Sequence, residues 1–442
     1  MDIKKFSIKG LYNERDIIIP FSEKVKILVA ENGYGKTTVL NSLYSLLTGD
    51  ELRLRKIPFT SLEIEFSNGE SYSINKEDLD LSLRNLDESP FYTVLINRIG
   101  ELQTTELINS FMNTSEERFK NSTRFRQVRM RSEMSSSMLF TYIKELVGSG
   151  NEAAQLLKAR KVLAKIKNSF NHTPVYLPTY RRVEQDIRPE IFDEQYQLST
   201  GNEQMNFGMG DVDSKIKEIT REILSSSVAW FSKINGEMLS QLVEGFNIDS
   251  IVRSKSLDLD AVKIVLDRIG NNIGQEQKKR ILEMIRSNEI LSGHDPLIYF
   301  ISNLTKVYEQ QKENDRRIHD FTEVCNRYLG DKMLQYNEST VTVDIVRRKN
   351  EERKVDIENL SSGEKQIISL FARLYLQKDD NLAIFFDEPE LSLSMEWQKT
   401  LLPDIMNSGK CAFLFTTTHS PFIFENELIN NAVDLGLYIK EL

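Results

Sequence analysis

The fold of this chain is decided by one short stretch, Ala30-Glu31-Asn32-Gly33-Tyr34-Gly35-Lys36-Thr37-Thr38. It follows the apolar run Lys24–Val29, which is typical of a buried strand, and it leads into Thr38–Leu47, where leucines recur at helical spacing. A strand, a glycine-containing loop and a helix are the context that a phosphate-binding loop requires. The alternative is a plain strand–turn–helix connection that binds nothing.

The residue types in this loop match what phosphate binding needs. Gly33 and Gly35 let backbone N–H groups close around phosphate oxygens. We expect Lys36 to reach the β- and γ-phosphates of ATP and Thr37 to ligate Mg²⁺. Ala30 stands where the usual pattern begins with glycine, a place that alanine can take at negative φ. The expected ATP-binding residues are Asn32, Gly33, Tyr34, Gly35, Lys36, Thr37 and Thr38.

A second motif, Leu360-Ser361-Ser362-Gly363-Glu364-Lys365-Gln366, opens a helix far down the chain. Small residues at a helix N-terminus let N–H groups approach an anion, which the helix dipole favours. The motif resembles the LSGGQ signature of ABC ATPases, in the LSSGE form of SMC-like ATPases. That resemblance implies that Ser361, Ser362, Gly363 and Glu364 contact ATP bound by a second copy of the chain. The alternative is a capping box, and the two roles do not exclude each other.

A third motif, Leu382–Glu390, is an apolar strand that ends in acidic residues, as a Walker B element does. We expect Asp387 to hold Mg²⁺ through its water shell and Glu388 to act as the general base towards the attacking water. The alternative is a strand that simply leaves the core, but its position after the signature helix favours the catalytic interpretation.

After the next strand, Cys411–Phe415, His419 occupies the place of the switch histidine that contacts the γ-phosphate in the same superfamily. An isolated histidine is otherwise a packing or surface residue. Two weaker features complete the set. Leu391–Ser394 aligns with the D-loop, and Gln185, near Arg181 and Arg182, is a candidate Q-loop glutamine for Mg²⁺, in each case with a structural role as the alternative.

The order of these motifs excludes Ras-like GTPases and hexameric AAA+ proteases, which lack a signature loop. We expect an α/β fold, an ABC-type ATPase head whose P-loop sheet carries flanking helices and is interrupted by a mainly helical insertion. Its parts would be residues 1–103, the insertion 104–334 with strand 174–178 returning to the sheet, and residues 335–442. Late strands are expected at Ser339–Arg347 and Lys354–Ile357.

Composition narrows the functional class. The formal charge of −9 excludes a surface built overall for nucleic acid, although a local basic patch stays open. The two cysteines, Cys325 and Cys411, form no CxxC, which excludes a thiolate zinc site and suits a reducing cytosol. The chain shows neither a signal peptide nor an apolar run long enough for a membrane helix. We therefore expect a cytoplasmic protein without a membrane partner.

Taken together, the texts ENGYGKTT, YLPTYRRVE, LSSGEKQ, FFDEPELSLSMEWQ and THSP resemble the OLD-like and RecF-like branch of ABC ATPases, many of which serve bacterial anti-phage defence. The AriA ATPases of PARIS systems are most similar, with the PtuA ATPases of Septu and retron systems as a close rival. An AriA-like identity implies a homo-oligomer, built on a dimeric ATP sandwich, that holds a Toprim-type nuclease of the AriB kind and releases it on sensing a phage protein. A PtuA-like identity implies an HNH nuclease instead.

No nuclease activity is expected of this chain itself. OLD nucleases carry a Toprim domain after the histidine motif, whereas this chain reaches Leu442 soon after it, and His172, His294 and His319 are scattered. A RecF-like or SMC-like DNA-repair ATPase, stimulated by DNA, is one alternative. A scaffold that binds ATP with negligible turnover is another.

One basic run stands out in this acidic chain. Arg118–Arg131 contains no acidic residue and has Phe119 and Phe125 interleaved with its cations. It is a candidate contact for a phage trigger, such as an acidic DNA mimic, or for DNA. The alternative is a solvated helix face that pairs with acidic segments of another subunit. Its basic residues are Arg118, Lys120, Arg124, Arg126, Arg129 and Arg131.

Overall fold

The structure is a computed structural model that describes residues 2–31, 33–79, 90–112, 116–132, 134–147, 150–177, 209–244 and 258–442. The chain forms two compact units, one made of Met1–Asn202 with Asp379–Leu442 and the other of Glu203–Lys378. These limits differ from the domain limits expected from the sequence, which stay predictions. In the described residues, no helix is both long and apolar enough to span a membrane.

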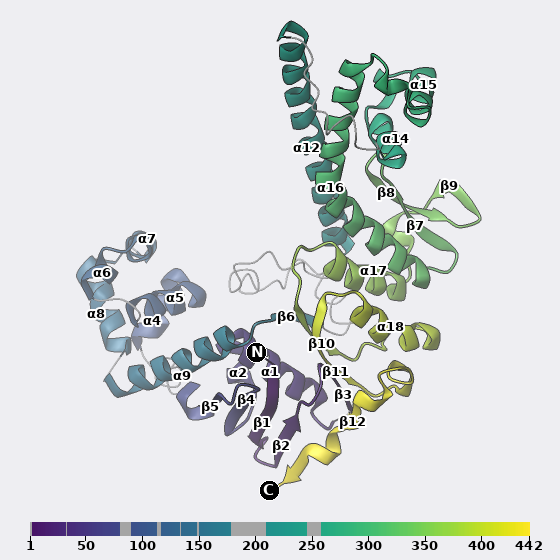
Figure 1. The fold of residues 1–442 in the computed structure, drawn as a ribbon. Coiled ribbons are helices and arrows are strands. Elements are labelled where there is room, and N and C mark those ends of the chain that lie inside the picture. Colours follow the sequence, from purple (N-terminus) through teal and green to yellow (C-terminus); the bar gives the residue numbers. More distant parts are fainter. Residues whose placement is uncertain are drawn as a thin grey trace. The chain divides into compact units, whose positions relative to one another are not determined.

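The first unit contains two sheets (Figure 1). One is antiparallel, in the order β13-β2-β1-β4-β5, and the other is parallel, in the order β12-β3-β11-β10-β6. The antiparallel strands are β1 (Ile3–Leu11), β2 (Arg15–Pro20), β4 (Ser61–Phe66), β5 (Ser71–Asn75) and β13 (Ile439–Glu441). The parallel strands are β3 (Val25–Val29), β6 (Thr173–Leu177), β10 (Leu382–Asp387), β11 (Cys411–Thr418) and β12 (Ala432–Asp434).

The parallel sheet is the core of this unit. Every residue of β10 is buried, as expected for a parallel strand covered on both faces. Helix α1 (Lys36–Thr48) packs on β6, β10 and β11 and on α9 (Gly150–Ser169). Its apolar side chains join residues of both sheets in one hydrophobic cluster. β6, which comes from the middle of the chain, pairs in parallel with β10.

Short helices between β5 and α9 form a second, smaller core in this unit. Aromatic residues of this core include Phe119 and Phe125, whose rings lie 5.1 Å apart. The shorter helices of the unit are α2 (Glu51–Lys56), α4 (Pro90–Ile99), α5 (Glu101–Met112), α6 (Glu116–Lys120), α7 (Thr123–Ser132), α8 (Ser136–Val147) and α18 (Met395–Asn407).

The second unit is mainly helical, with one small antiparallel sheet in the order β7-β8-β9. The long helices α12 and α16 run side by side (Figure 1). Its elements are α12 (Met209–Glu244), α14 (Leu259–Arg268), α15 (Gln275–Arg286), α16 (Asp295–Tyr328), β7 (Lys332–Asn337), β8 (Thr342–Arg347), β9 (Asn350–Lys354) and α17 (Ser362–Tyr375).

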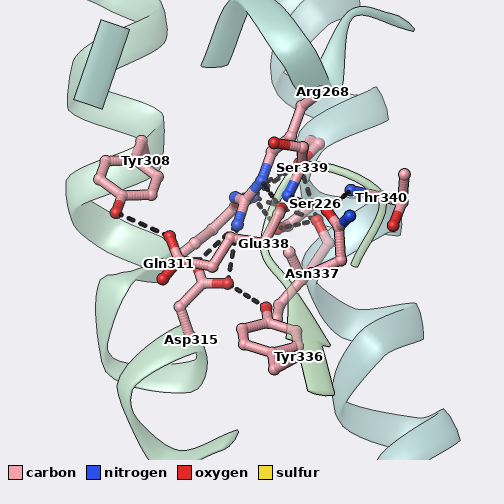
Figure 2. A network of polar contacts seen from close by, with 12 residues as sticks. Ser226, Arg268, Tyr308, Gln311, Asp315, Tyr336, Asn337, Glu338, Ser339 and Thr340 are labelled. Carbon is pink, nitrogen blue, oxygen red and sulfur yellow. Dashed lines mark hydrogen bonds and ion pairs between the residues drawn. The ribbon is translucent and has the colours of Figure 1, made fainter. Parts of the chain in front are cut away.

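A buried polar network ties these helices to β7 (Figure 2). Arg268 of α14 donates to both carboxylate oxygens of Asp315 at 2.7 and 2.8 Å, and to Gln311 Oε1 at 2.8 Å. Tyr336 donates to Asp315 as well. Burial next to that carboxylate raises the pKa of Tyr336, so the phenol stays a donor. The buried charges of Arg268 and Asp315 thus pair with each other, and further hydrogen bonds satisfy their polar atoms. A buried ion pair needs both to offset the cost of removing its charges from water.

The α/β fold class expected from the sequence is confirmed, with one correction in the second unit. A strand was expected at Lys354–Ile357, but β9 ends at Lys354 and Ile357–Asn359 form a 3₁₀ turn. The chain has to turn there because the α17 cap follows directly. Strand β7, which contains the expected domain limit at 334/335, was not expected from the sequence.

Candidate nucleotide-binding site

The loop between β3 and α1 has the backbone that phosphate binding requires. Gly33 and Gly35 have φ of +91° and +85°, in the left-handed region that favours glycine. Helix α1 begins at Lys36, and its N-cap, Gly35, has no side chain to satisfy the first N–H groups. Such a helix N-terminus suits a phosphate group. Asn32 lies outside the described residues, and Tyr34 is exposed.

Lys36 is buried, and its ammonium group turns back on the loop. Nζ donates to the carbonyl oxygens of Ala30 at 2.5 Å and Glu31 at 3.3 Å. Carbonyl oxygens are weaker partners for an ammonium than charged phosphate oxygens. The loop therefore holds a cation that can exchange two neutral acceptors for an anionic ligand.

A hydroxyl and a carboxylate meet beside this loop. Thr37 Oγ1 donates to Asp387 Oδ1 at 3.1 Å, and Thr417 Oγ1 donates to the same oxygen at 2.8 Å. Asp387 ends β10 directly opposite Thr417 of β11, and its side chain is buried. Oxygen donors of this kind fit Mg²⁺, so Thr37 and Asp387 are the residues that would hold it. The role of Thr417 was not predicted from the sequence.

Glu388 follows Asp387 in a backbone conformation that is rare for its residue type. Its φ is +47°, and its N–H donates to Thr417 O at 2.9 Å. A glutamate in this region is strained by about 1–3 kcal/mol, and strain of this kind clusters at functional sites. Glu388 is half-buried and follows Asp387 directly, at the carboxyl end of β10.

His419, the first residue after β11, is paired with an acidic residue that the sequence analysis did not select. Its Nδ1 lies 2.8 Å from Glu390 Oε1, and its backbone N–H donates to the same oxygen at 2.9 Å. The Glu390 side chain is 4% exposed and that of His419 is 45% exposed. The last acid of the text DEPE, Glu390, was the only available signal for this partner, and it says nothing about burial.

Two weaker candidates have different outcomes. Gln185, with Arg181 and Arg182, lies outside the described residues, so its role stays a prediction. Ser394, in the expected D-loop, is the N-cap of α18 and accepts a hydrogen bond from Trp397 N at 3.3 Å. That contact is a structural role for its hydroxyl.

The signature motif lies in the second unit, where it caps α17. Ser361 is the N-cap, and it forms a reciprocal capping box with Glu364. Lys332 of β7 donates to both oxygens of Glu364 at 2.9 Å. Burial alone would raise the pKa of Glu364, but the hydrogen bonds from Lys332 and Ser361 outweigh it, and the pKa is lowered. Ser362 is exposed at the start of the helix, and Gly363 is buried behind it.

The basic run occupies α6, α7 and the turn between them. All of its cationic side chains are exposed, while Phe119 and Phe125 are buried and anchor the two helices. Arg124 pairs with Glu106 at 2.9 Å, and the Lys120 ammonium lies 3.8 Å from the centre of the Phe140 ring. No ion pair with another described residue is seen for Arg118, Arg126 and Arg129.

One cluster of metal-ligand types lies elsewhere in the described residues. His319, Asp320 and Glu323 of α16 place ligand atoms within 4.8 Å of one another. The His319 and Glu323 side chains are 59% and 72% exposed, and each of the three comes from the same stretch of one helix. Exposed groups spaced in this way are common on solvated helices, and the cluster adds nothing to the site above.

Comparisons with known proteins agree with a nucleotide-binding domain. Residues 1–424 match the family described as the AAA ATPase domain. Among solved structures, the chain is similar to an Smc head domain with an extended coiled coil from Pyrococcus furiosus, bound to the C-terminal domain of ScpA. The identity is 13% and the TM-score 0.36, over 100% of this chain and 96% of that chain. An SmcHead bound to the C-winged helix domain of ScpA is also similar, with 11% identity and a TM-score of 0.34, over 100% and 98% of the two chains. Scores this low carry no conclusion about function. No curated protein matches.

Proposed function

The chain belongs to the AAA ATPase domain family, and on that basis we propose that it is an ABC-type ATPase that binds ATP with Mg²⁺ between two copies of itself and hydrolyses it. The observation that carries this proposal is the convergence of Lys36, Thr37 and Asp387 with Glu388 and His419 at one edge of the parallel sheet. Carboxyl ends of parallel strands are where α/β proteins bind ligands.

Each of these residues has a proposed task. Lys36 and the first N–H groups of α1 bind the phosphates, with Gly33 and Gly35 shaping the loop. Thr37 and Asp387 would hold Mg²⁺, which would offset the negative charge of the phosphate oxygens. Glu388 accepts the proton of the attacking water. His419 donates to an oxygen of the γ-phosphate, the group that is transferred to water.

The signature supports a site shared by two copies of the chain. The cap uses the Ser361 hydroxyl and the Glu364 carboxylate, while Ser362 is exposed at an N-terminus suited to an anion. We propose that this turn binds the γ-phosphate of ATP held by the other copy. The same arrangement would make a homodimer the smallest active assembly.

Complementation tests the shared site. Ser362→Arg places a bulky cation at the signature and should abolish turnover while ATP binding persists. Ser225→Arg, on an exposed position of α12, is the matched control and should keep parental turnover. Mixing Ser362→Arg protein with Lys36→Ala protein should restore part of the activity, since each supplies the half-site that the other lacks. No recovery in mixed dimers that have been isolated as such would contradict a shared site.

We propose further that this ATPase is the sensor and scaffold of an anti-phage complex, which holds a separately encoded nuclease and releases it on sensing a phage protein. The support is the motif resemblance to OLD-like defence ATPases, with a Toprim or an HNH nuclease as the effector. The exposed cations Arg118, Arg126 and Arg129 suit an acidic trigger.

The test is phage challenge of cells that carry the gene alone or with its neighbouring gene. Protection should require both genes, and Arg126→Glu with Arg129→Glu should abolish it while leaving basal ATP turnover unchanged. Protection by this chain alone would contradict the scaffold role. ATP turnover that rises on addition of DNA would instead favour the RecF-like or SMC-like repair ATPase.

A further inference from the structure

The pairing of His419 with Glu390 follows from the strand order. β10 and β11 are parallel neighbours, with Asp387 opposite Thr417. Glu390 lies in the turn after β10, and His419 is the first residue after β11. The turn and the strand end therefore meet at the edge where the nucleotide-binding residues converge.

A third residue holds this meeting point together. Gln398 of α18 donates to the carbonyl oxygens of Leu393 at 3.0 Å and Glu390 at 3.4 Å. It also accepts from Ser420 Oγ at 2.6 Å. Gln398 thus links the backbone beside the Glu390 carboxylate to Ser420, the residue after the histidine. These hydrogen bonds hold Glu390 and His419 in place relative to each other.

Among the described residues, the polar contacts to the Glu390 carboxylate all come from His419. Glu390 Oε1 accepts from the backbone N–H of His419 and faces its Nδ1 at 2.8 Å. Glu390 Oε2 is buried and meets no hydrogen-bond donor among the described residues. A carboxylate can only accept, so the ring nitrogen that faces it has to carry the proton. Nε2 is then the ring nitrogen that remains for a ligand. A ligand can reach it because the His419 side chain is 45% exposed.

We propose that Glu390 is a positioning residue that fixes the proton of His419 on Nδ1 and so commits Nε2 to the bound nucleotide. The role given to Glu390 rests on the proposed ATPase function, whereas the geometry of the Glu390–His419 pair does not depend on that function. Phosphate oxygens only accept, so a ring that donates to them from Nε2 holds a proton on both nitrogens. The carboxylate against Nδ1–H offsets the positive charge of that ring, as carboxylates do behind metal-bound and catalytic histidines.

Nitrogen NMR of the histidine rings tests the geometry without any turnover. The chain has 4 histidines, so histidine-specific ¹⁵N labelling gives few signals, and His419→Gln assigns the relevant one. In the parent and in Glu390→Gln, which keeps an oxygen acceptor, the proton should sit on Nδ1. In Glu390→Leu, which has no acceptor, it should move towards Nε2. An unchanged tautomer in Glu390→Leu, or a proton on Nε2 in the parent, would overturn the proposal.

Kinetics test the role. Glu390→Leu should lower kcat by about 10- to 100-fold with KM within a few-fold, as is usual when the partner of a functional histidine is removed. Glu396→Leu, a nearby exposed acid of α18, is the control and should keep parental kinetics. If Glu390 acts through His419, the double variant Glu390→Leu with His419→Ala should have a kcat no lower than that of the less active single variant. Losses that multiply would refute action through the histidine.

The two proposals fail in different ways. Parental turnover in His419→Ala would remove the histidine from the ATPase mechanism and with it the functional part of this inference, while the tautomer result would still decide the positioning. A protonated Nδ1 that depends on Glu390, together with a kcat loss in both single variants, is the expected outcome. If Glu390→Leu does not fold, Glu390→Gln takes its place in the kinetic cycle and should lower kcat to a smaller extent, because it removes the charge and keeps the acceptor. Parental kcat in Glu390→Gln would then overturn the charge argument.

Discussion

Lys332→Met should loosen the first turn of the signature helix. The Lys332 ammonium contacts both oxygens of Glu364 at 2.9 Å, and the two side chains are only 11% and 7% exposed. Glu364 Oε2 would keep two donors, the N–H of Ser361 at 2.7 Å and its hydroxyl at 3.0 Å. Glu364 Oε1 would lose Lys332, its one hydrogen-bond donor within the part of the chain that the structure describes. Methionine keeps the length of the side chain and removes the charge.

The size of the effect follows from these contacts. A hydrogen bond to a charged group contributes about 1.5–3 kcal/mol. Complete loss of the partner of a buried charge costs about 3–5 kcal/mol, but the Ser361 donors keep Glu364 from that limit. We therefore expect Lys332→Met to lower the free energy of opening the first turn of α17 by about 2–3 kcal/mol. The first turn should then open about 30- to 150-fold more often.

Hydrogen exchange measured by mass spectrometry reads this opening locally, which suits a chain of two units better than a global unfolding curve. Peptides that cover the first turn of α17 should exchange faster in Lys332→Met by the factor above. Lys354→Met is the matched control, because Lys354 pairs with Asp344 at 2.8 Å but is 69% exposed. A surface pair of this kind contributes about 0–1 kcal/mol, and the control should leave α17 unchanged.

Acidity supplies a second check. The pKa of Glu364 is lowered from its usual 4.5, so its ion pair stabilises the fold above that value and the contribution disappears as the pH falls through the lower folded value. The ratio of exchange rates between Lys332→Met and the parent, taken at equal pH, should be largest at neutral pH and should fall towards one below pH 4.5. Equal rates at neutral pH, or a ratio that persists in acid, would refute this reasoning.

Three further changes address the nucleotide site. Lys36→Ala should abolish tight ATP binding in a titration with a fluorescent ATP analogue, since no other side chain of the loop offers a cation; affinity within a few-fold of the parent would refute this role. Glu388→Gln should bind ATP but lose at least about 100-fold in kcat, and near-parental turnover would mean that another group activates the water. Thr417→Val should remove one donor to Asp387 and raise the Mg²⁺ concentration needed for half-maximal turnover; an unchanged Mg²⁺ titration would make Thr417 purely structural.

The parts of the site that could be predicted are those that local sequence determines. Glycines at positive φ, an apolar strand and a helix with leucines at regular spacing each leave a signal within a short window, as Gly33 and Gly35 show. The fold class followed from the order of such windows. The contact of Thr37 with Asp387, which are 350 positions apart, could not be predicted from such windows alone, because it depends on which strands are neighbours.

The parts that could not be predicted depend on long-range pairing of polar side chains. Lys332 reaches Glu364 from a strand that was not expected from the sequence, since Lys332–Asn337 alternates poorly and four of its six residues are only partly buried. Glu390 looked like one more surface acid, yet it is 4% exposed behind His419. Ser394 looked like a D-loop position of unknown role, and its hydroxyl caps α18. Burial and pairing of this kind leave no periodic trace in a sequence.

The signature turn has a structural role as the cap of α17, and we propose a second role for it in ligand binding. The Ser361 hydroxyl accepts from Glu364 N at 3.3 Å and donates to Glu364 Oε2 at 3.0 Å, so both of these residues are occupied by the cap. Ser362 and Gly363 remain for an anion, and the cap fixes the helix terminus that presents them. The two roles then separate experimentally. Ser362→Arg should block turnover and leave exchange of α17 as in the parent, whereas Lys332→Met should speed exchange first and reduce turnover only through the looser turn. If both variants changed exchange and turnover together, the cap and the proposed phosphate contact would be one indivisible function.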